Sequence, residues 1–178
     1  MCFRFWRRNR ASYFPLISFI PYLEKIEFHI VEGKIICERG REILGDFAHL
    51  HFHEQLPQLA NPVHIIHAGS SIQYVSDWKE LLVELVKYQP RLLVLDDLLA
   101  GDIPSFITTQ AYHGKKIRSW FLNINELIEE VQALDYQLIY KSRCTQNFLS
   151  EVGGPLPMKN FAPQYRLNYG SHLMFKQM

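Results

Sequence analysis

The sequence predicts an α/β fold in which helices alternate with the strands of a mostly parallel sheet. One observation behind this is a series of short, nearly continuous apolar runs at 27–31, 63–68 and 91–95. Such runs are typical of strands that helices cover on both faces. The other is that segments with helical periodicity separate the runs, and the order strand, helix, strand builds parallel units with right-handed crossovers.

The first part of the chain is predicted to hold two helices on either side of one strand. Residues 12–23 form a helix that opens on a serine N-cap, and Pro15 lies in its first turn, where proline is tolerated. The strand at 27–31 comes next. Apolar residues at helical spacing then predict a helix at 34–44, which ends at Gly45.

The middle of the chain is predicted to add three strands and one helix. Residues 49–55 alternate histidine with apolar residues, which is the period-2 pattern of a strand. A proline-containing loop leads to the strand at 63–68. Apolar residues at helical spacing predict a helix capped by Ser76, and Pro90 ends it just before the strand at 91–95.

The last part of the chain is predicted to begin with an insertion and to end with a hairpin. Residues 99–121 hold glycine and proline among aromatic residues, which predicts a long irregular insertion over the cleft. A short helix at 125–134 follows. Two final strands, at 136–142 and 172–176, are expected to pair antiparallel across a long glycine-containing loop.

Composition favours one soluble domain, 1–178, in a reducing compartment. Of its 178 residues, 48% are hydrophobic, which suffices for a single core. Lysine plus arginine total 19 against 18 acidic residues, so no nucleic-acid partner is expected. The three cysteines show no metal or disulfide spacing, and no apolar stretch reaches transmembrane length. We therefore expect a cytoplasmic protein; its oligomeric state is not predicted.

Polar residues stand where the predicted strands end. They are Glu32, Ser70, Ser71, Asp96 and Asp97. In an open α/β sheet the carboxyl ends of the strands line the ligand crevice, so these side chains are expected to face one cleft. A carboxylate at the tip of an early strand can accept hydrogen bonds from both ribose hydroxyls of a nucleotide, which predicts a nucleoside-bearing cofactor.

Several short motifs together resemble a bacterial family of S-adenosylmethionine (SAM)-dependent methyltransferases that are often encoded among surface-polysaccharide genes. The resemblance extends from residue 11 to the C-terminus. It rests on the motifs Ser-Ser-Ile-Gln-Tyr at 70–74, Asp-Trp at 77–78, Asp-Asp at 96–97, Gly-Asp-Ile-Pro-Ser-Phe-Ile-Thr-Thr-Gln at 101–110 and Ser-Trp-Phe at 119–121.

The resemblance implies a Rossmann-like class I methyltransferase sheet with a C-terminal antiparallel hairpin. It also implies SAM as the cofactor, with Glu32 on the ribose, and methyl transfer to a glycan or another small polar acceptor. The other cofactor-binding candidates are Gly33, Ser70 and Ser71. The acceptor is expected to contact Gln73, Tyr74, Gln110, Tyr112 and Trp120. The base candidates are His113, Asp96 and Asp97, with His67 as a weaker one.

Several alternatives stay open. Asp96 and Asp97 could only cap the segment that follows them, and the aromatic residues of the insertion could only pack. The histidines of 49–55 share a strand face, but such a row is more often solvated than metal-binding, so no metal site is predicted. The chain could also be an inactive Rossmann-like binding or scaffolding module. A weaker alternative is a nucleotide-sugar-modifying enzyme that uses NAD, because an acid after the second strand suits its ribose as well.

The start of the chain departs from the family pattern. Class I methyltransferases carry a glycine-rich turn after the first strand, where the backbone approaches the cofactor closely. Residues 4–10 here read Arg-Phe-Trp-Arg-Arg-Asn-Arg. Bulky cationic side chains therefore stand where the methionine part of the cofactor is expected, which predicts impaired cofactor binding.

We predict that residues 1–10 are aberrant because the gene is frameshifted and shortened, with the proper frame restored near Ala11. Codons for residues 2–10 can be chosen so that the frame one base later reads Val-Leu-Asp-Phe-Gly-Gly-Ala-Ile-Gly, a first strand with a glycine loop. Sequencing the source DNA tests this. Codons that encode no glycine loop in the shifted frame contradict it.

Overall fold

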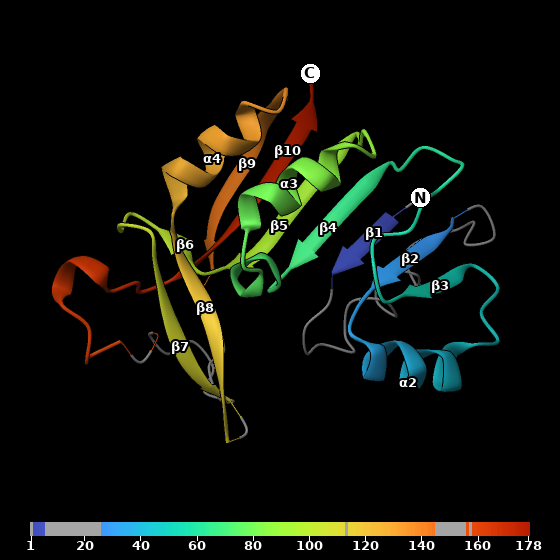
Figure 1. The fold of residues 1–178 in the computed structure, drawn as a ribbon. Coiled ribbons are helices and arrows are strands. Elements are labelled where there is room, and N and C mark those ends of the chain that lie inside the picture. Colours follow the sequence, from blue (N-terminus) through green and yellow to red (C-terminus); the bar gives the residue numbers. More distant parts are fainter. Residues whose placement is uncertain (1, 6–25, 113, 145–155, 157) are drawn as a thin grey trace.

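The computed structural model describes residues 2–5, 26–112, 114–144, 156 and 158–178. Within these residues, the main sheet has seven strands in the order β3-β2-β1-β4-β5-β10-β9 (Figure 1). The predicted helix at 12–23 lies outside the described residues. The order reverses between β1 and β4, because the chain runs to one side of β1 through β2 and β3 and to the other side through β4 and β5.

The strands confirm the predicted mixture of parallel and antiparallel pairing. The parallel strands are β1 (Cys2–Phe5), β2 (Phe28–Val31), β3 (Leu50–His53), β4 (Ile65–Gly69) and β5 (Leu92–Leu98). The last two strands, β9 (Tyr136–Cys144) and β10 (Gly170–Gln177), are antiparallel to each other, and β10 is also antiparallel to β5. The carboxyl ends of the five parallel strands therefore share one edge of the sheet.

The helices lie close to their predicted positions, and one cap differs. They are α2 (Lys34–Leu44), α3 (Trp78–Val86) and α4 (Ile124–Gln132), with the 3₁₀ turns η2 (Ile72–Tyr74) and η3 (Pro163–Tyr165). Ser76 does not cap α3. Asp77 does, because its carboxylate accepts a hydrogen bond of 2.9 Å from the Glu80 backbone N–H. None of the helices among the described residues is long and apolar enough to cross a membrane.

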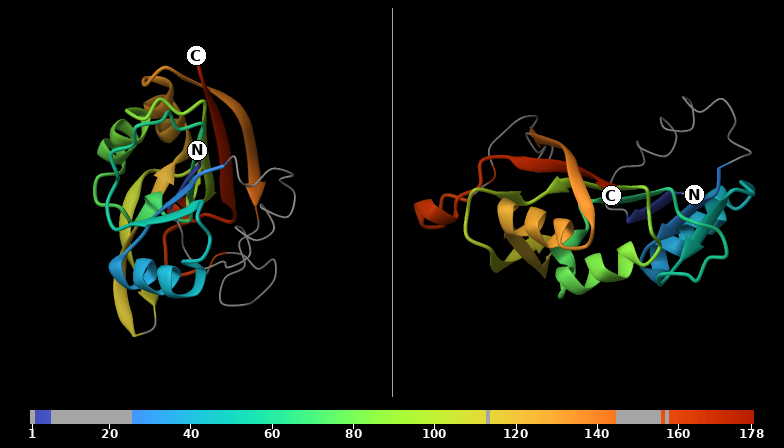
Figure 2. Two further views of the ribbon diagram at one scale, coloured as in Figure 1. Left: turned by 90° about the vertical axis from the view of Figure 1, so that its right-hand side faces the viewer. Right: turned by 90° about the horizontal axis from the view of Figure 1, so that it is seen from above.

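Helices α3 and α4 cover one face of the main sheet (Figure 2). The apolar side of α3 packs on the alternate residues of β4 and β5 that point to this face, where Leu82, Leu85, Leu93 and Leu95 are fully buried, and α4 lies against β9. Burial of each such side chain contributes roughly 1.5–3 kcal/mol. This layer of leucines holds the carboxyl ends of β4 and β5 in place.

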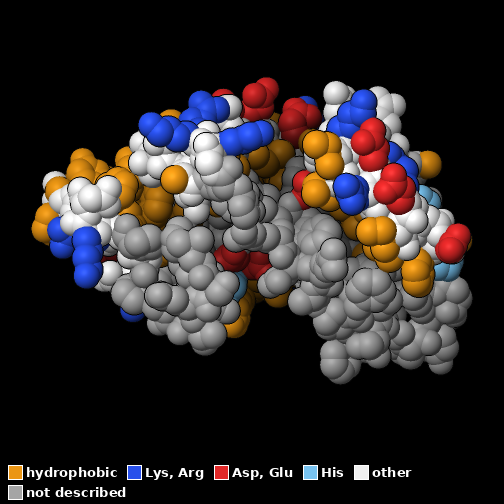
Figure 3. Space-filling model, turned by 90° about the horizontal axis from the view of Figure 1, so that it is seen from below, with side chains coloured by type: hydrophobic (Ala, Val, Ile, Leu, Met, Phe, Trp, Pro, Cys, Tyr) orange, Lys and Arg blue, Asp and Glu red, His pale blue; other side chains and the backbone are white. Residues whose placement is uncertain are grey.

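Helix α2 lies against the other face of the sheet, over β2 and β3. Phe28 and Leu50 form a small core there, and the ring of Phe52 packs where Gly40 of α2 has no side chain. The outward side of α2 is mixed in character, with Ile35 and Ile43 about 70% exposed among charged residues (Figure 3). Helix α2 connects β2 to β3 on one side of β1, and α3 connects β4 to β5 on the other side. Because both crossovers are right-handed, the two helices must lie on opposite faces of the sheet.

The expected irregular insertion at 99–121 is in fact regular β structure. It consists of β6 (Ala100–Gly101), β7 (Phe106–Tyr112) and β8 (Lys115–Asn123), with β7 and β8 paired antiparallel. Gly114 has φ of 76°, a left-handed conformation that suits the tight turn between the two strands. The prediction was wrong because glycines and prolines were given more weight than the β-branched and aromatic residues on either side of the turn.

A second core holds this hairpin beyond the carboxyl ends of β4 and β5 (Figure 1). The rings of Phe106 and Phe121 stack with centroids 5.0 Å apart, and Phe161 packs against both. The buried residues of this core are Leu99, Ile103, Phe121, Leu156, Met158 and Leu167. The hairpin is thus packed on the segment that precedes β10 as well as on the sheet.

Acid is expected to destabilise the fold through the histidine of β2. His29 is 7% exposed. Burial, followed by the nearby imidazoles of His51 and His53, lowers the pKa of His29 to about 4 from 6.5. Between these values the unfolded chain binds a proton that the folded chain does not, so stability falls as the pH falls through this range.

We predict that the free energy of unfolding decreases from pH 6.5 to pH 4, by at most about 3 kcal/mol through His29. Urea unfolding followed by circular dichroism at a series of pH values measures this. His29→Gln removes the titration and should flatten the dependence. An equal pH dependence in both proteins assigns the acid sensitivity to other groups.

Candidate functional site

The carboxyl ends of β4 and β5 approach each other closely at Gly69. This glycine pairs with Asp96 across the two strands. A Cβ at Gly69 would lie 2.5 Å from the Asp96 carboxylate and 3.0 Å from the His67 ring, so a larger residue would require the carboxylate to move. The absence of a side chain therefore lets two polar groups of neighbouring strands meet at the sheet edge.

Two non-glycine residues with left-handed backbone stand side by side at this edge. Ser70 has φ of 48° and Asp97 has φ of 50°. The Ser70 hydroxyl donates to the Asp97 carboxylate, and the Ser70 N–H donates to the Asp96 carbonyl at 3.0 Å. Such conformations cost of order 1–3 kcal/mol each and cluster at functional sites. Their hydrogen bonds hold the strained pair in one geometry.

An imidazole–carboxylate pair lies beside this turn. His67 Nε2 is 2.9 Å from Asp96 Oδ2, and the two side chains are 19% and 35% exposed. A carboxylate bound to one ring nitrogen fixes the ring and leaves Nδ1 as the proton-accepting atom. The arrangement raises His67 from a weaker sequence candidate to the best-placed base among the described residues.

A second histidine, which the sequence did not indicate, contacts the end of β5. The Asp97 N–H donates to His172 Nδ1 at 3.2 Å. His172 lies on β10, which is far away in sequence and reaches β5 only through the antiparallel pairing. Its role could not be found from motifs, because an isolated histidine in a predicted strand carries no local signal.

The segment after β4 holds buried polar atoms that have no partner. Gln73 is 2% exposed, and its Nε2 donates to the Asp97 carbonyl at 3.2 Å. Among the described residues, Gln73 Oε1 and Ser71 Oγ are buried without a hydrogen-bond partner. Buried polar groups are almost always hydrogen-bonded, so two of them in neighbouring positions at a strand end indicate a ligand site.

Glu32 lies directly after β2 on the same edge of the sheet. Its backbone N–H donates to the His53 carbonyl at 2.9 Å, and its Oε2 accepts from the Gly33 N–H at 3.2 Å. Gly33 has φ of −61° and open space where a Cβ would point. The geometry thus explains the place of the carboxylate, but it gives no steric reason for the glycine after it.

The predicted acceptor residues bring the hairpin and η2 together. The Tyr74 hydroxyl donates to Gln110 Oε1 at 3.1 Å, and Trp120 Nε1 donates to the Ser76 carbonyl at 3.2 Å. These bonds fix β7 and β8 against the segment after β4. His113 and the side chain of Tyr112 lie outside the described residues.

A polar hollow of about 260 Å³ opens near the start of β10. Its lining includes Asp102, Lys141, Arg143, Tyr169 and Ser171, and the Arg143 guanidinium lies 4.4 Å from the Tyr169 ring centre. Because β10 is antiparallel to β5, its first residues stand at the same edge as the ends of β4 and β5. Ser171 and Arg143, which both line the hollow, are paired in the register of β10 and β9.

The Cys144 thiol near Asp96 and Asp97 is not poised to act as a nucleophile. Burial, together with the nearby charges of Asp97 and Asp96, raises the pKa of Cys144 to about 11. Close to neutral pH the thiol is therefore protonated, which excludes thiolate chemistry at this edge.

No protein-family model and no curated protein matches the sequence. Solved structures do match the fold. A candidate SAM-dependent methyltransferase from Listeria monocytogenes is 6% identical with a TM-score of 0.63, covering 99% of this chain and 91% of that chain. The glycopeptide N-methyltransferase MtfA, complexed with S-adenosylhomocysteine, is 10% identical with a TM-score of 0.64, covering 99% and 82%.

The fold is that of class I methyltransferases. The predicted Rossmann-like sheet with its C-terminal antiparallel pair is thereby confirmed. The same fold also occurs in the cyclase SpnF, which is 11% identical with a TM-score of 0.55, covering 99% of this chain and 74% of that chain. Because one fold serves different reactions, the activity has to be argued from the site.

We predict that Ser71→Ala stabilises the protein without ligand by about 1 kcal/mol, because it removes a buried hydroxyl that lacks a partner. Ser119→Ala is a matched control, since Ser119 Oγ on β8 is also buried without a partner among the described residues. Thermal unfolding should show a rise of a few degrees for both variants. A lower midpoint for Ser71→Ala means that its hydroxyl has a partner in the protein.

Proposed function

We propose that this chain is a SAM-dependent methyltransferase that acts on a glycan or another small polar acceptor. The observation that carries the proposal is the pair of buried, unpartnered oxygens of Ser71 and Gln73. They stand at the carboxyl end of β4, next to the point where the strand order reverses between β1 and β4. Ligands of open α/β sheets bind at such a point.

The residues on this edge fit a nucleoside-bearing cofactor. The Glu32 carboxylate follows β2, where it can accept hydrogen bonds from ribose hydroxyls. The oxygens of Ser71 and Gln73 can bond to polar groups of the ligand. MtfA, which shares the fold, is solved with S-adenosylhomocysteine and with SAM.

The chain's own chemistry in this reaction is positioning and proton transfer. When bound, SAM supplies a methyl group on a sulfonium, which is already a strong electrophile. A hydroxyl acceptor must lose a proton, and His67, with Nε2 held by Asp96, takes it at Nδ1. The Ser70–Asp97 contact keeps the turn after β4 in place while the hairpin covers this edge.

The polar hollow at the start of β10 is the proposed acceptor site. Its lining combines charged groups with the Tyr169 ring, a mixture that suits a ligand with hydroxyl groups and an apolar face. Gln110 and Trp120 belong to the hairpin next to this edge, so the hairpin is proposed to contribute to acceptor selection.

Two alternatives are weighed against this proposal. An inactive binding or scaffolding module is favoured by residues 6–10, Trp-Arg-Arg-Asn-Arg, which follow β1 in place of a glycine-rich turn. An NAD-dependent enzyme is disfavoured by the antiparallel pair β9–β10. The inactive-module alternative rests only on residues 6–10. If the rest of the site is intact, a glycine-rich turn in their place should restore SAM binding.

We predict that replacing residues 2–10 with Val-Leu-Asp-Phe-Gly-Gly-Ala-Ile-Gly strengthens SAM binding, measured by isothermal titration calorimetry. In the repaired protein, Glu32→Ala should weaken binding about tenfold or more, because charge-assisted hydrogen bonds are lost. Glu42→Ala serves as the control, since Glu42 is an exposed carboxylate on α2 outside the proposed site.

The outcomes separate the hypotheses. Binding only after repair supports an inactive present form of a methyltransferase. A repaired protein that ignores SAM contradicts the methyltransferase proposal altogether. An unchanged affinity of Glu32→Ala removes Glu32 from the site while leaving the fold argument untouched.

A further inference from the structure

Four histidines and a glutamate gather on β2 and β3, on the face that α3 covers further along the sheet. They are Glu27, His29, His49, His51 and His53, and they are called the histidine cluster below. The strand register places His29 beside His51 and Val31 beside His53, and neighbouring residues of parallel strands point to the same face. Val31 belongs to the core under α3, which identifies that face.

The cluster is closely packed. His51 Nε2 lies 2.5 Å from Glu27 Oε2, and His29 Nδ1 lies 2.9 Å from His53 Nε2. The ring of His29 stacks on those of His51 and His53, with centroids 4.7 Å and 5.2 Å apart. His49 Nδ1 is 3.7 Å from Glu27 Oε1. From the sequence we expected the histidines of 49–55 to form a solvated or half-buried face. In the structure, β2 adds the buried imidazole of His29, and Glu27 just before β2 adds a carboxylate.

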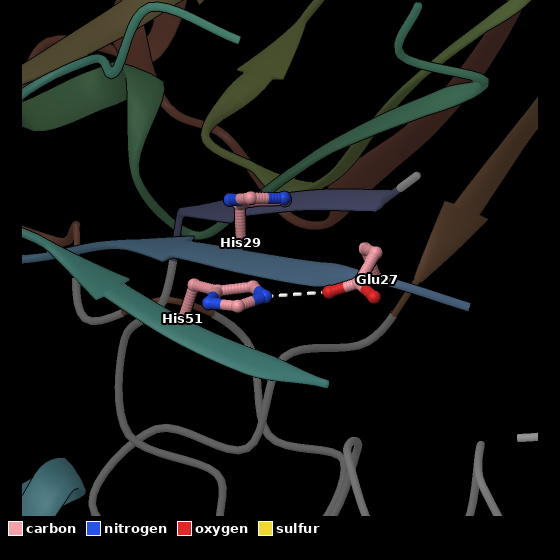
Figure 4. Close-up of side chains that lie close together, drawn as sticks. All are labelled: Glu27, His29 and His51. Carbon is pink, nitrogen blue, oxygen red and sulfur yellow. Dashed lines mark hydrogen bonds and ion pairs between the residues drawn. The ribbon is translucent and has the colours of Figure 1, made fainter. Parts of the chain in front are cut away.

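Three of these side chains place possible metal-ligand atoms close together. One ligand atom each from Glu27, His29 and His51 lies within 4.8 Å of the others (Figure 4). Around a tetrahedral Zn²⁺, with ligand bonds of about 2.0–2.2 Å, neighbouring ligand atoms stand roughly 3.4 Å apart. Rotation of partly exposed side chains closes this difference, and Glu27 and His51 are 43% and 39% exposed.

We propose that Glu27, His29 and His51 bind one divalent transition-metal ion, with Zn²⁺ as the best match. Two imidazoles and a carboxylate suit zinc and its late first-row neighbours, whereas Mg²⁺ and Ca²⁺ prefer sites made of oxygen ligands. Three protein ligands leave the fourth position to water. His53 positions His29 through their hydrogen bond, as an outer partner of a metal-bound histidine does.

The position of the cluster separates the proposed ion from the proposed site of methyl transfer. Strand β3 is at the edge of the main sheet, and the ion joins it to β2 through side chains. The connection 54–64 between β3 and β4 contains no helix, so no helix of this connection covers the cluster. Glu27 precedes β2 and Glu32 follows it, which places the ion toward the strand end opposite the proposed cofactor site. The ion therefore stabilises the sheet edge rather than taking part in methyl transfer.

The test is a Zn²⁺ titration of the full chain without a histidine tag, after treatment with EDTA. A chromophoric chelator competes for the ion and reports affinity and stoichiometry. The variants Glu27→Gln and His51→Gln remove a ligand at partly exposed positions. His64→Gln is the matched control, because His64 is an exposed histidine outside the cluster.

The expected result is one ion per chain, a higher thermal midpoint with Zn²⁺, and binding about tenfold weaker or more in both ligand variants but unchanged in His64→Gln. Circular dichroism verifies that each variant is folded. Co²⁺ should give the visible absorption of a tetrahedral site in the unaltered protein. Absence of one-to-one binding to the unaltered chain, or equal affinity in all variants, overturns the proposal.

Discussion

The whole main sheet depends on one four-residue strand. β1 pairs with β2 from Cys2 opposite Phe28 to Phe5 opposite Val31, and with β4 from Cys2 opposite Ile65 to Phe5 opposite Ala68. Among the described strands, the pairing between the β2–β3 half and the β4–β5–β10–β9 half passes through β1 alone. The pairing uses backbone N–H and C=O groups, which every residue except proline carries. Residues of many kinds can therefore form this central strand, because its pairing does not depend on their side chains.

In the proposed active site, a small number of contacts position polar side chains at the carboxyl ends of the strands. The missing side chain at Gly69 lets the Asp96 carboxylate reach His67, and the strained backbone at Ser70 and Asp97 is held by their mutual hydrogen bond. Strain at these positions is sustained because the leucine core beneath α3 fixes both strands. The fold thus supplies rigidity on one side of the strands and polar, partly unsatisfied groups at their ends.

The histidine cluster and the proposed active site lie at different places on the sheet and differ in physical character. At the active edge, polar atoms of Ser71 and Gln73 are buried without partners, which is the property of a site for an organic ligand. In the cluster, side chains already contact one another, and one ligand atom each from Glu27, His29 and His51 lies within 4.8 Å of the others. A ligand at either place would stabilise the folded state. Only the proposed active site, however, adjoins the point between β1 and β4 where the strand order reverses.

Much of the local structure could be predicted from the sequence, because it depends on short-range periodicity. The bounds of α2, the apolar parallel strands and the antiparallel final pair followed from apolar spacing, and the polar strand ends pointed to Glu32, Ser70 and Asp97. The hairpin of β7 and β8 was missed, since its turn signal was read as irregular structure. Whether the predicted side chains bind cofactor and acceptor stays a prediction.

Tertiary structure alone decided which distant residues meet. His172 reaches Asp97 only because β10 inserts antiparallel between β5 and β9, and Glu27 and His29 join the histidines of β3 only through the register of two parallel strands. Strand order arises from the packing of the whole sheet, and the register of two strands depends on how the apolar faces of both are buried together. The sequence by itself therefore determined the kinds of element and the chemistry at their ends, and the tertiary structure determined the partners, because contacts across a sheet join residues that the chain keeps far apart.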